Sequence, residues 1–102
     1  MTELQLSTAI EEILVARNPR NMQVARAALE PGYYLRAAQY LQGIRETIII
    51  GTGFPVTSTF ETDGPVGAIA LYDTLEGLGA RPILACGPPL SDALLEDYRV
   101  LQ

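Results

Sequence analysis

The N-terminal part of the chain begins with a segment whose apolar residues recur at helical spacing. This pattern predicts an amphipathic helix from Thr8 to about Arg17, with Thr8 and Glu11 at the spacing of a capping box. Four residues fall on one side of this helix by the three-four rule: Ile10, Ile13, Leu14 and Arg17.

Two further helices are predicted before the chain changes character. Pro19 and the Pro31-Gly32 pair interrupt the helical pattern, and the spacing resumes after each break, over residues 22–29 and 33–42. Gly43 suits the C-cap of the second of these helices. We therefore expect the chain to open with a run of short helices.

After these helices the pattern becomes that of alternating strands and helices. Thr47 to Ile50 is a short β-branched run without alternation, which is typical of a strand covered on both faces. Three more elements are predicted after it: a helix from Pro65 to about Leu78, a strand from Ile83 to Cys86, and a helix from Asp92 to about Tyr98 capped by Ser91.

This order of elements predicts an α/β fold. A helical segment, residues 1–45, precedes a Rossmann-like β-α-β-α unit with a small parallel sheet, residues 46–102, in one domain. A parallel sheet of two strands needs both faces covered and both edges protected. We therefore expect homo-oligomerisation or a partner subunit to complete the sheet, unless the chain is part of something longer.

Composition excludes several classes of function. The chain has 7 Arg, no Lys and 12 acidic residues, and its net charge of −5 argues against nucleic acid or an anionic membrane as partner. The absence of His excludes a Ser-His-Asp or Cys-His mechanism within the chain. The single cysteine, Cys86, lies in an apolar run and is interpreted as a buried thiol. No membrane helix or signal peptide is predicted, and we expect a cytoplasmic protein.

The candidate site lies in the long connection after the first strand. Residues 51–64 exceed the usual length of a strand-to-helix connection, and ligands of parallel α/β folds bind beyond the carboxyl ends of the strands. Backbone amides near Gly67, at the start of the predicted helix, favour an anion such as a carboxylate. Asp63 caps this helix, takes part in the chemistry, or both, whereas Glu61 is the better candidate for acid–base catalysis.

No cofactor is expected from this connection. Gly51-Thr52-Gly53 begins a dinucleotide fingerprint, but Val56 stands at the position of its third glycine, and no helix begins there. The lack of Lys excludes a Walker-type phosphate loop. A divalent metal held by Asp63 and Glu61 is an alternative, although two carboxylates alone do not define a metal site.

Two motifs in this region resemble a known family. Thr52-Gly53-Phe54-Pro55, then Glu61-Thr62-Asp63-Gly64-Pro65, and then Gly67-Ala68 and Ala70-Leu71 are similar to the signature of the D-glutamate cyclase C-terminal-like family, long known as a domain of unknown function. The helices before them and the Asn18-Pro19-Arg20 break are similar to the start of that domain. Because family domains are longer, the resemblance is to their N-terminal portion and implies a truncated relative.

The resemblance implies a lyase activity, because the characterised relatives convert D-glutamate to 5-oxo-D-proline and water. That reaction needs a proton-transfer group and a cradle for an oxyanion, and Glu61 and Asp63 are the candidates for proton transfer. The residues expected to bind the substrate, or a related small carboxylate or amino acid, are Thr52, Gly53, Thr62, Gly64 and Gly67. The alternative is a non-catalytic relative that acts as an assembly or regulatory subunit.

Overall fold

The computed structural model divides the chain into two compact units, a helical unit, Met1–Gly43, and a sheet unit, Ile44–Gln102. The structure describes the backbone of residues 1–56, 59–60 and 63–102, and the side chains of residues 1–54 and 63–102. Within this described part, no helix is both long enough and apolar enough to cross a membrane.

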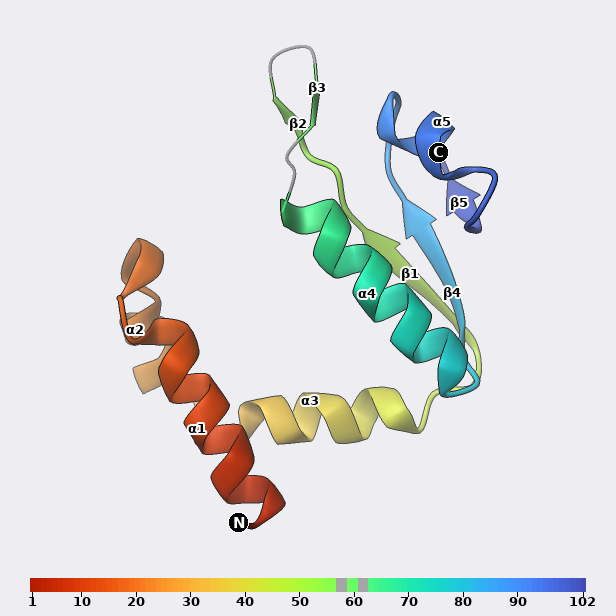
Figure 1. Ribbon diagram of the computed structural model, residues 1–102. Coiled ribbons are helices and arrows are strands. Elements are labelled where there is room, and N and C mark those ends of the chain that lie inside the picture. The colour runs from red at the N-terminus through yellow and green to blue at the C-terminus, as the bar shows by residue number, and fades with distance from the viewer. Residues whose placement is uncertain (57–58, 61–62) are drawn as a thin grey trace. The chain divides into compact units, whose positions relative to one another are not determined.

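The helical unit consists of short helices joined by tight turns (Figure 1). They are α1, Glu3–Val15; the 3-10 turn η1, Pro19–Asn21; α2, Met22–Ala27; and α3, Tyr33–Gln42. The predicted bounds of α3 and its Gly43 C-cap are confirmed. Between the first two helices the chain turns through left-handed backbone conformations at Asn18, Arg20 and Asn21.

The first helix differs from its prediction in where it starts. Thr2 is its N-cap, and the capping box is formed by Thr2 and Gln5 rather than by Thr8 and Glu11. The Thr2 hydroxyl oxygen accepts from the Gln5 amide at 3.1 Å, and the Gln5 side-chain oxygen accepts from the Thr2 amide at 2.8 Å. Thr8 lies inside the helix, where its hydroxyl donates to the Leu4 carbonyl.

The buried stripe of α1 is also not the apolar one. Its buried residues are Ser7, Glu11 and Val15, whereas three of the apolar residues that mark the predicted side are exposed: Ile10, Ile13 and Leu14. The helix therefore turns a largely polar stripe towards the rest of the helical unit.

The polar stripe is buried because it caps α3. Gly32, the N-cap of that helix, has a φ of 95° and no side chain to satisfy the first amides. Glu11 supplies both carboxylate oxygens instead: Oε1 accepts from the Gly32 amide at 3.0 Å, and Oε2 accepts from the Tyr34 amide at 3.0 Å. The Ser7 hydroxyl donates to Glu11 and accepts from the Leu35 amide at 2.9 Å. These contacts fix α1 to the start of α3.

Two opposing effects set the pKa of the Glu11 carboxyl group. Burial raises the pKa, whereas the hydrogen bonds from Ser7, Gly32 and Tyr34, together with the positive charge of Arg26, lower it. The hydrogen bonds and the charge prevail, and the pKa lies below its usual value of 4.5. Glu11 is therefore ionised in the folded protein at neutral pH.

The sheet unit contains the predicted pair of parallel strands, and its α/β class is confirmed. β1, Thr47–Gly51, pairs with β4, Arg81–Ala85, in a register that places Ile49 opposite Ile83. A third strand that the sequence did not predict, β5, Val100–Leu101, pairs in parallel with the other edge of β4. Two residues are too few to show a periodic pattern, so this strand left no signal in the sequence.

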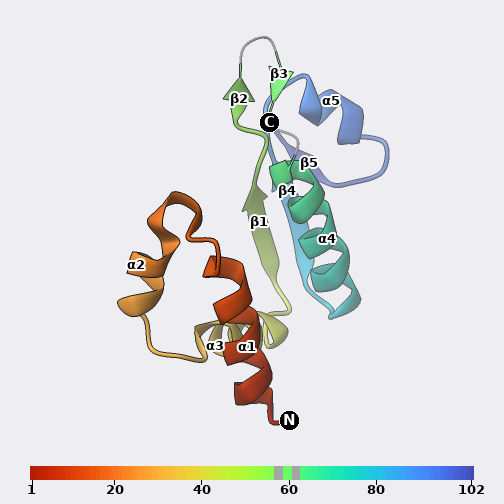
Figure 2. The same ribbon diagram turned by 60° about the vertical axis from the view of Figure 1, so that its left-hand side comes forward.

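One helix covers one face of this sheet. Figures 1 and 2 both show α4, Asp63–Gly77, running along β1 and β4. Ile50 and Leu84 are opposite each other in the register and are buried, whereas Ile49 points to the other face and its side chain is 60% exposed. In the described part of the sheet unit, α4 covers one face of β1, and the other face is exposed at Ile49.

The connection between β1 and α4 is shorter than predicted and is not a plain loop. It contains two short antiparallel strands, β2, Pro55–Val56, and β3, Thr59–Phe60, with Pro55 opposite Phe60. The helix after it begins at Asp63 rather than at Pro65. Pro65 stands in the first turn as predicted, where a missing amide costs nothing.

The last helix is shorter and begins earlier than predicted. α5 spans Leu90–Leu94 instead of Asp92 to Tyr98, and its N-cap is Pro89. Ser91 is therefore not a cap: it lies inside the helix, is fully buried, and its hydroxyl accepts from the Gln102 side chain at 2.8 Å.

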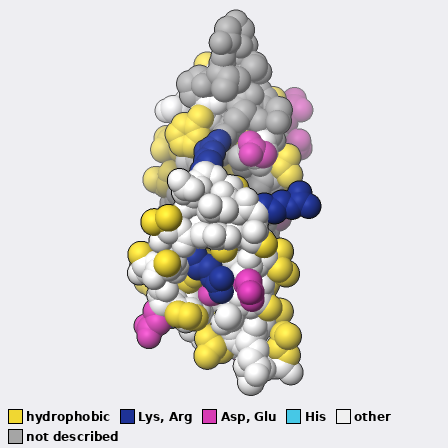
Figure 3. Space-filling model, turned by 90° about the vertical axis from the view of Figure 1, so that its left-hand side faces the viewer, with side chains coloured by type: hydrophobic (Ala, Val, Ile, Leu, Met, Phe, Trp, Pro, Cys, Tyr) yellow, Lys and Arg dark blue, Asp and Glu magenta, His cyan; other side chains and the backbone are white. Residues whose placement is uncertain are grey.

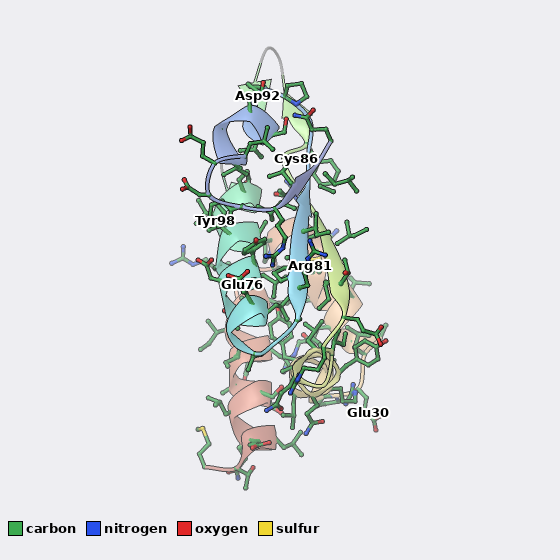
Figure 4. All side chains as sticks on the ribbon, turned by 90° about the vertical axis from the view of Figure 1, so that its right-hand side faces the viewer. Glu30, Glu76, Arg81, Cys86, Asp92 and Tyr98 are labelled. Carbon is green, nitrogen blue, oxygen red and sulfur yellow. The ribbon has the colours of Figure 1, made fainter. Side chains whose placement is uncertain are left out.

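A buried tyrosine holds the C-terminal strand in place. The Tyr72 hydroxyl on α4 accepts from the Arg99 amide at 3.1 Å, and the Tyr72 ring meets the Tyr98 ring edge to face at 5.1 Å. The Arg99 guanidinium lies 5.3 Å from the centre of the Tyr72 ring and donates to Glu76 at 2.8 Å and to the Pro82 carbonyl at 3.0 Å. Figure 4 shows Tyr98 and Glu76 on this side of the unit.

Replacing Glu11 with Gln should destabilise the helical unit and change its response to acid. One carboxylate oxygen is replaced by an NH2 group, which cannot accept a hydrogen bond from a backbone N–H. The Tm at pH 7 should therefore fall by about 5 °C or more. Because the pKa is lowered on folding, the contribution of the ionised group is fully present above the unfolded value of 4.5 and disappears as the pH falls through the lower folded value. Circular dichroism melts between pH 3 and pH 7 measure both effects. Glu12→Gln, at an exposed neighbouring position, is the control, and an equal Tm for both variants would contradict the cap.

Replacing Tyr72 with Phe should destabilise the attachment of β5 without creating a cavity in the core. The variant keeps the ring but leaves the Arg99 amide without its acceptor, which should lower the free energy of unfolding by about 1 kcal/mol. Urea unfolding measures this change, and Tyr40→Phe at a position that is 75% exposed is the matched control. Equal stabilities of the two variants would show that the hydroxyl does not hold β5.

Candidate functional site

Because β1 and β4 are parallel, the carboxyl ends of both strands lie at the same end of the sheet. The Thr52 amide donates to the Ala85 carbonyl at 3.1 Å and continues the pairing beyond β1. Figure 4 shows Cys86 directly after β4, with Asp92 of α5 at the same end of the unit. Ligands of parallel α/β folds bind at this end.

Gly53 allows the chain after β1 to pass close to the start of α5. Its φ is 75°, and a Cβ at this position would lie 2.5 Å from a Leu90 methyl carbon and 3.5 Å from the Cys86 Cβ. The backbone conformation therefore favours glycine, and any other side chain would also have to displace the Leu90 methyl group. The predicted site residue Gly53 thus has a structural role at this end of the sheet.

Thr52 has a buried hydroxyl oxygen with no hydrogen-bond partner in the described part of the chain. A buried polar group without a partner costs about 1–3 kcal/mol, so an unpaired hydroxyl calls for an explanation. A hydroxyl both donates and accepts, and within the described residues this one does neither. Thr52 was among the residues predicted to bind substrate.

The start of α4 differs from the anion site that the sequence predicted. Because the helix begins at Asp63, the amide of Gly67 lies in its second turn, where the regular pattern directs it to the Asp63 carbonyl. The Gly64 amide donates to the exposed Asp63 carboxylate at 3.0 Å, so Asp63 lies inside the first turn and binds a neighbouring amide, whereas the sequence predicted a cap for the amides near Gly67. A Cβ on Gly67 would meet no atom within 4 Å. The predicted role of Gly67 as a backbone donor to an anion is therefore not supported by the position of this residue in the helix.

Two predicted site residues, Glu61 and Thr62, lie outside the described residues. Their roles remain predictions, and the same holds for a metal shared by Glu61 and Asp63. Among the residues that the structure describes, no group of three or more His, Cys, Asp or Glu side chains could hold a metal ion.

Cys86 is a buried thiol, as predicted. It forms no disulfide, and burial raises the pKa of its thiol above the usual value of 9.0. The thiol is therefore protonated at neutral pH, which does not favour a nucleophile.

The arginines of the sheet unit are not at this end of the strands. Arg45 precedes β1 and Arg81 begins β4, so both belong to the amino ends, and the Arg99 guanidinium is bonded to Glu76 and to the Pro82 carbonyl. A carboxylate bound beyond β1 and β4 would therefore be held by hydroxyl and amide donors of the described residues rather than by a guanidinium.

The helical unit contains a pocket that the sequence did not predict. It measures about 680 Å³ and lies between the end of α1, α2 and the segment before α3. None of the predicted site residues lines it. Its lining residues are scattered from position 12 to position 33, so no local motif could have identified it.

Comparison with known proteins identifies the family. The family model described as D-glutamate cyclase-like, C-terminal, matches residues 10–100, which include both motifs and the helices before them. Neither the curated proteins nor the solved structures contain a significant match to the chain. The match extends over both units and most of the sequence, and the chain belongs to the D-glutamate cyclase-like, C-terminal family.

Proposed function

We propose that the chain binds D-glutamate beyond the carboxyl ends of β1 and β4 and dehydrates it to 5-oxo-D-proline. Membership of the D-glutamate cyclase-like family supports this reaction class. The observation that carries the location is the buried hydroxyl of Thr52, which has no hydrogen-bond partner among the described residues, beside Gly53 with its left-handed backbone. Both residues belong to the motif on which the resemblance rests.

The chemistry requires one group that transfers a proton. The amine nitrogen forms a bond to the γ-carboxyl carbon, the bond from that carbon to one oxygen breaks, and this oxygen leaves as water. The ammonium nitrogen loses two protons in the reaction and the departing γ-carboxylate oxygen gains both, and a protein carboxylate can carry them from the nitrogen to that oxygen in turn. Asp63 is exposed and uses one of its oxygens for the Gly64 amide, so its other oxygen is open to substrate. Glu61 is the second candidate for the same step.

Neutral donors would bind the substrate carboxylate. Thr52 contributes a hydroxyl from the end of β1, and the motif adds the backbone at Gly53 and Gly64 and the hydroxyl of Thr62. A hydrogen bond from a neutral donor to a charged carboxylate contributes about 1.5–3 kcal/mol, and no guanidinium adds a bidentate ion pair to it. We therefore expect modest affinity for D-glutamate.

The activity should appear in ¹H NMR spectra of the chain mixed with D-glutamate. Signals of 5-oxo-D-proline should grow with time, L-glutamate should give none, and Asp63→Asn or Glu61→Gln should slow the reaction about 100-fold for whichever residue transfers the proton. Thr52→Val removes the hydroxyl at nearly constant volume and should weaken D-glutamate binding about tenfold, because a hydrogen bond to a charged group is lost. Thr74→Val, at an exposed position on α4, is the matched control.

The outcomes separate the parts of the proposal. Saturable binding of D-glutamate without turnover would leave a binding site and refute the cyclase reaction. An unchanged affinity of Thr52→Val would refute the assignment of this hydroxyl, and no binding by the folded chain would refute the proposal as a whole.

A second candidate function is that of a non-catalytic assembly subunit, and the edge of the sheet favours it. β1 is an edge strand, since the described strands follow the order β1, β4, β5, and it carries neither charge nor proline in Thr47–Gly51. Edge strands without such protection pair readily with other strands. We propose a second copy as the partner, because a two-fold axis at Ile49 would pair β1 with itself in an antiparallel manner and cover two exposed Ile49 side chains.

Sedimentation analysis of the purified chain measures this association. The account predicts a monomer–dimer equilibrium that Ile49→Lys shifts to the monomer, because each dimer would then oppose two like charges. Ile13→Lys, at a helical position that is 74% exposed, is the control for added charge. A monomer at all concentrations, or a dimer that survives Ile49→Lys, would contradict pairing through β1.

A further inference from the structure

The pocket of the helical unit has the size of a small-molecule site. Its volume of about 680 Å³ lies within the range of about 300–1,000 Å³ that is typical of ligand pockets. The space exists because the left-handed turn at residues 18–21 sends α2 back beside the end of α1. The lining residues come from α1, α2 and the segment before α3: Glu12, Val15, Ala16, Gln23, Arg26, Ala27, Leu29, Pro31 and Tyr33.

One positive charge in this pocket makes no direct hydrogen bond or ion pair within the described residues, although it acts on Glu11 from a distance. Arg26 is half-buried, and its guanidinium makes no hydrogen bond or ion pair with any residue in the described part of the chain. Its charge acts on Glu11, but the oxygens of that carboxylate already accept from Ser7, Gly32 and Tyr34. The donors of Arg26 are therefore left for an anion that enters the pocket.

One negative charge and an apolar surface complete the lining. Glu12 projects from α1 beside the buried stripe and, within the described chain, pairs with no cation. Val15, Leu29 and Pro31 add apolar side chains to the lining. A smaller pocket of about 130 Å³ shares Val15, Arg26, Leu29 and Tyr33 and adds the apolar side chains of Leu14 and Met22. Figure 3 shows this side of the helical unit, where hydrophobic side chains reach the surface beside basic and acidic ones.

We propose that this pocket binds a free α-amino acid with an apolar side chain. The Arg26 guanidinium pairs with the α-carboxylate, the Glu12 carboxylate pairs with the α-ammonium group, and the apolar side chain packs against Val15 and Leu29. One cation and one anion in the lining match the one carboxylate and one ammonium group of such a ligand. A second carboxylate, as in glutamate, has no cation left in this pocket. The lining shares no residue with the site proposed beyond β1 and β4.

The test compares leucine with two analogues that each lack one charge. Leucine, 4-methylpentanoate and 3-methylbutylamine share the same branched chain, and only leucine carries both charged groups. In ¹H–¹⁵N NMR titrations of the full chain at pH 7, leucine should shift the amides of residues 12–16 and 23–33 saturably. Each analogue and glutamate should bind at least about tenfold more weakly, since each lacks a charge pair or adds an unpaired charge.

Variants assign the two charges. Arg26→Gln should weaken leucine binding at least about tenfold, and Glu12→Gln should weaken it to a smaller extent because Glu12 is the more exposed residue. Arg17→Gln and Glu3→Gln make the same changes outside the pocket lining and should leave the affinity unchanged. The wild-type comparison of leucine with its analogues is independent of how well any variant folds.

Three results would overturn the proposal. The first is the absence of saturable shifts up to about 10 mM leucine. The second is binding of 4-methylpentanoate as tight as that of leucine, which would remove any role for Glu12. The third is a set of shifts confined to residues 51–54 and 86–91, which would place the ligand in the sheet unit and not in this pocket.

Discussion

The parallel pairing of β1 and β4 is the constraint on which the sheet unit depends. Its register sets Ile50 against Leu84 beneath α4 and ends with the Thr52 amide bonded to the Ala85 carbonyl. Because the strands run in the same direction, two segments that are distant in the sequence, 51–54 and 86–90, lie next to each other at the carboxyl end of the sheet. The Gly53 backbone then lies close to Leu90, and the Thr52 hydroxyl is buried without a hydrogen-bond partner among the described residues. The geometry of the candidate site at Thr52 and Gly53 follows from this pairing.

The helical unit depends on a different interaction, a buried carboxylate that caps another helix. Glu11 satisfies amides at the start of α3, whose own N-cap is a glycine, and its contacts outweigh the unfavourable effect of burial. This interaction also explains why an apolar helix face is exposed on α1. The two units therefore offer different chemistry: the sheet unit presents neutral donors beyond its strands, whereas the helical unit places the charges of Arg26 and Glu12 in the lining of a pocket.

Elements with strong local signals could be predicted from the sequence. The strands β1 and β4 could be predicted from their short apolar, β-branched runs. The helix α3 could be predicted from its helical spacing between breaks at proline and glycine. The inward face of α1 was mispredicted because Glu11 is buried by hydrogen bonds to residues about twenty positions away, which no helical pattern records. The strands β2, β3 and β5 are set by pairing rather than by periodicity. For the site, the sequence identified Thr52 and Gly53, but the burial of the first and the contacts of the second arise only in the folded chain.

The most direct test of this account is a proton NOE measurement on the isotopically labelled chain. The account predicts strong NOEs from the Gly53 α-protons to a Leu90 methyl group, because a Cβ at Gly53 would lie 2.5 Å from that carbon. It also predicts interstrand NOEs between Ile49 and Ile83 in the parallel register. Interstrand contacts without the NOE from Gly53 to Leu90 would contradict the assembly of the site, and absence of both would contradict the sheet itself.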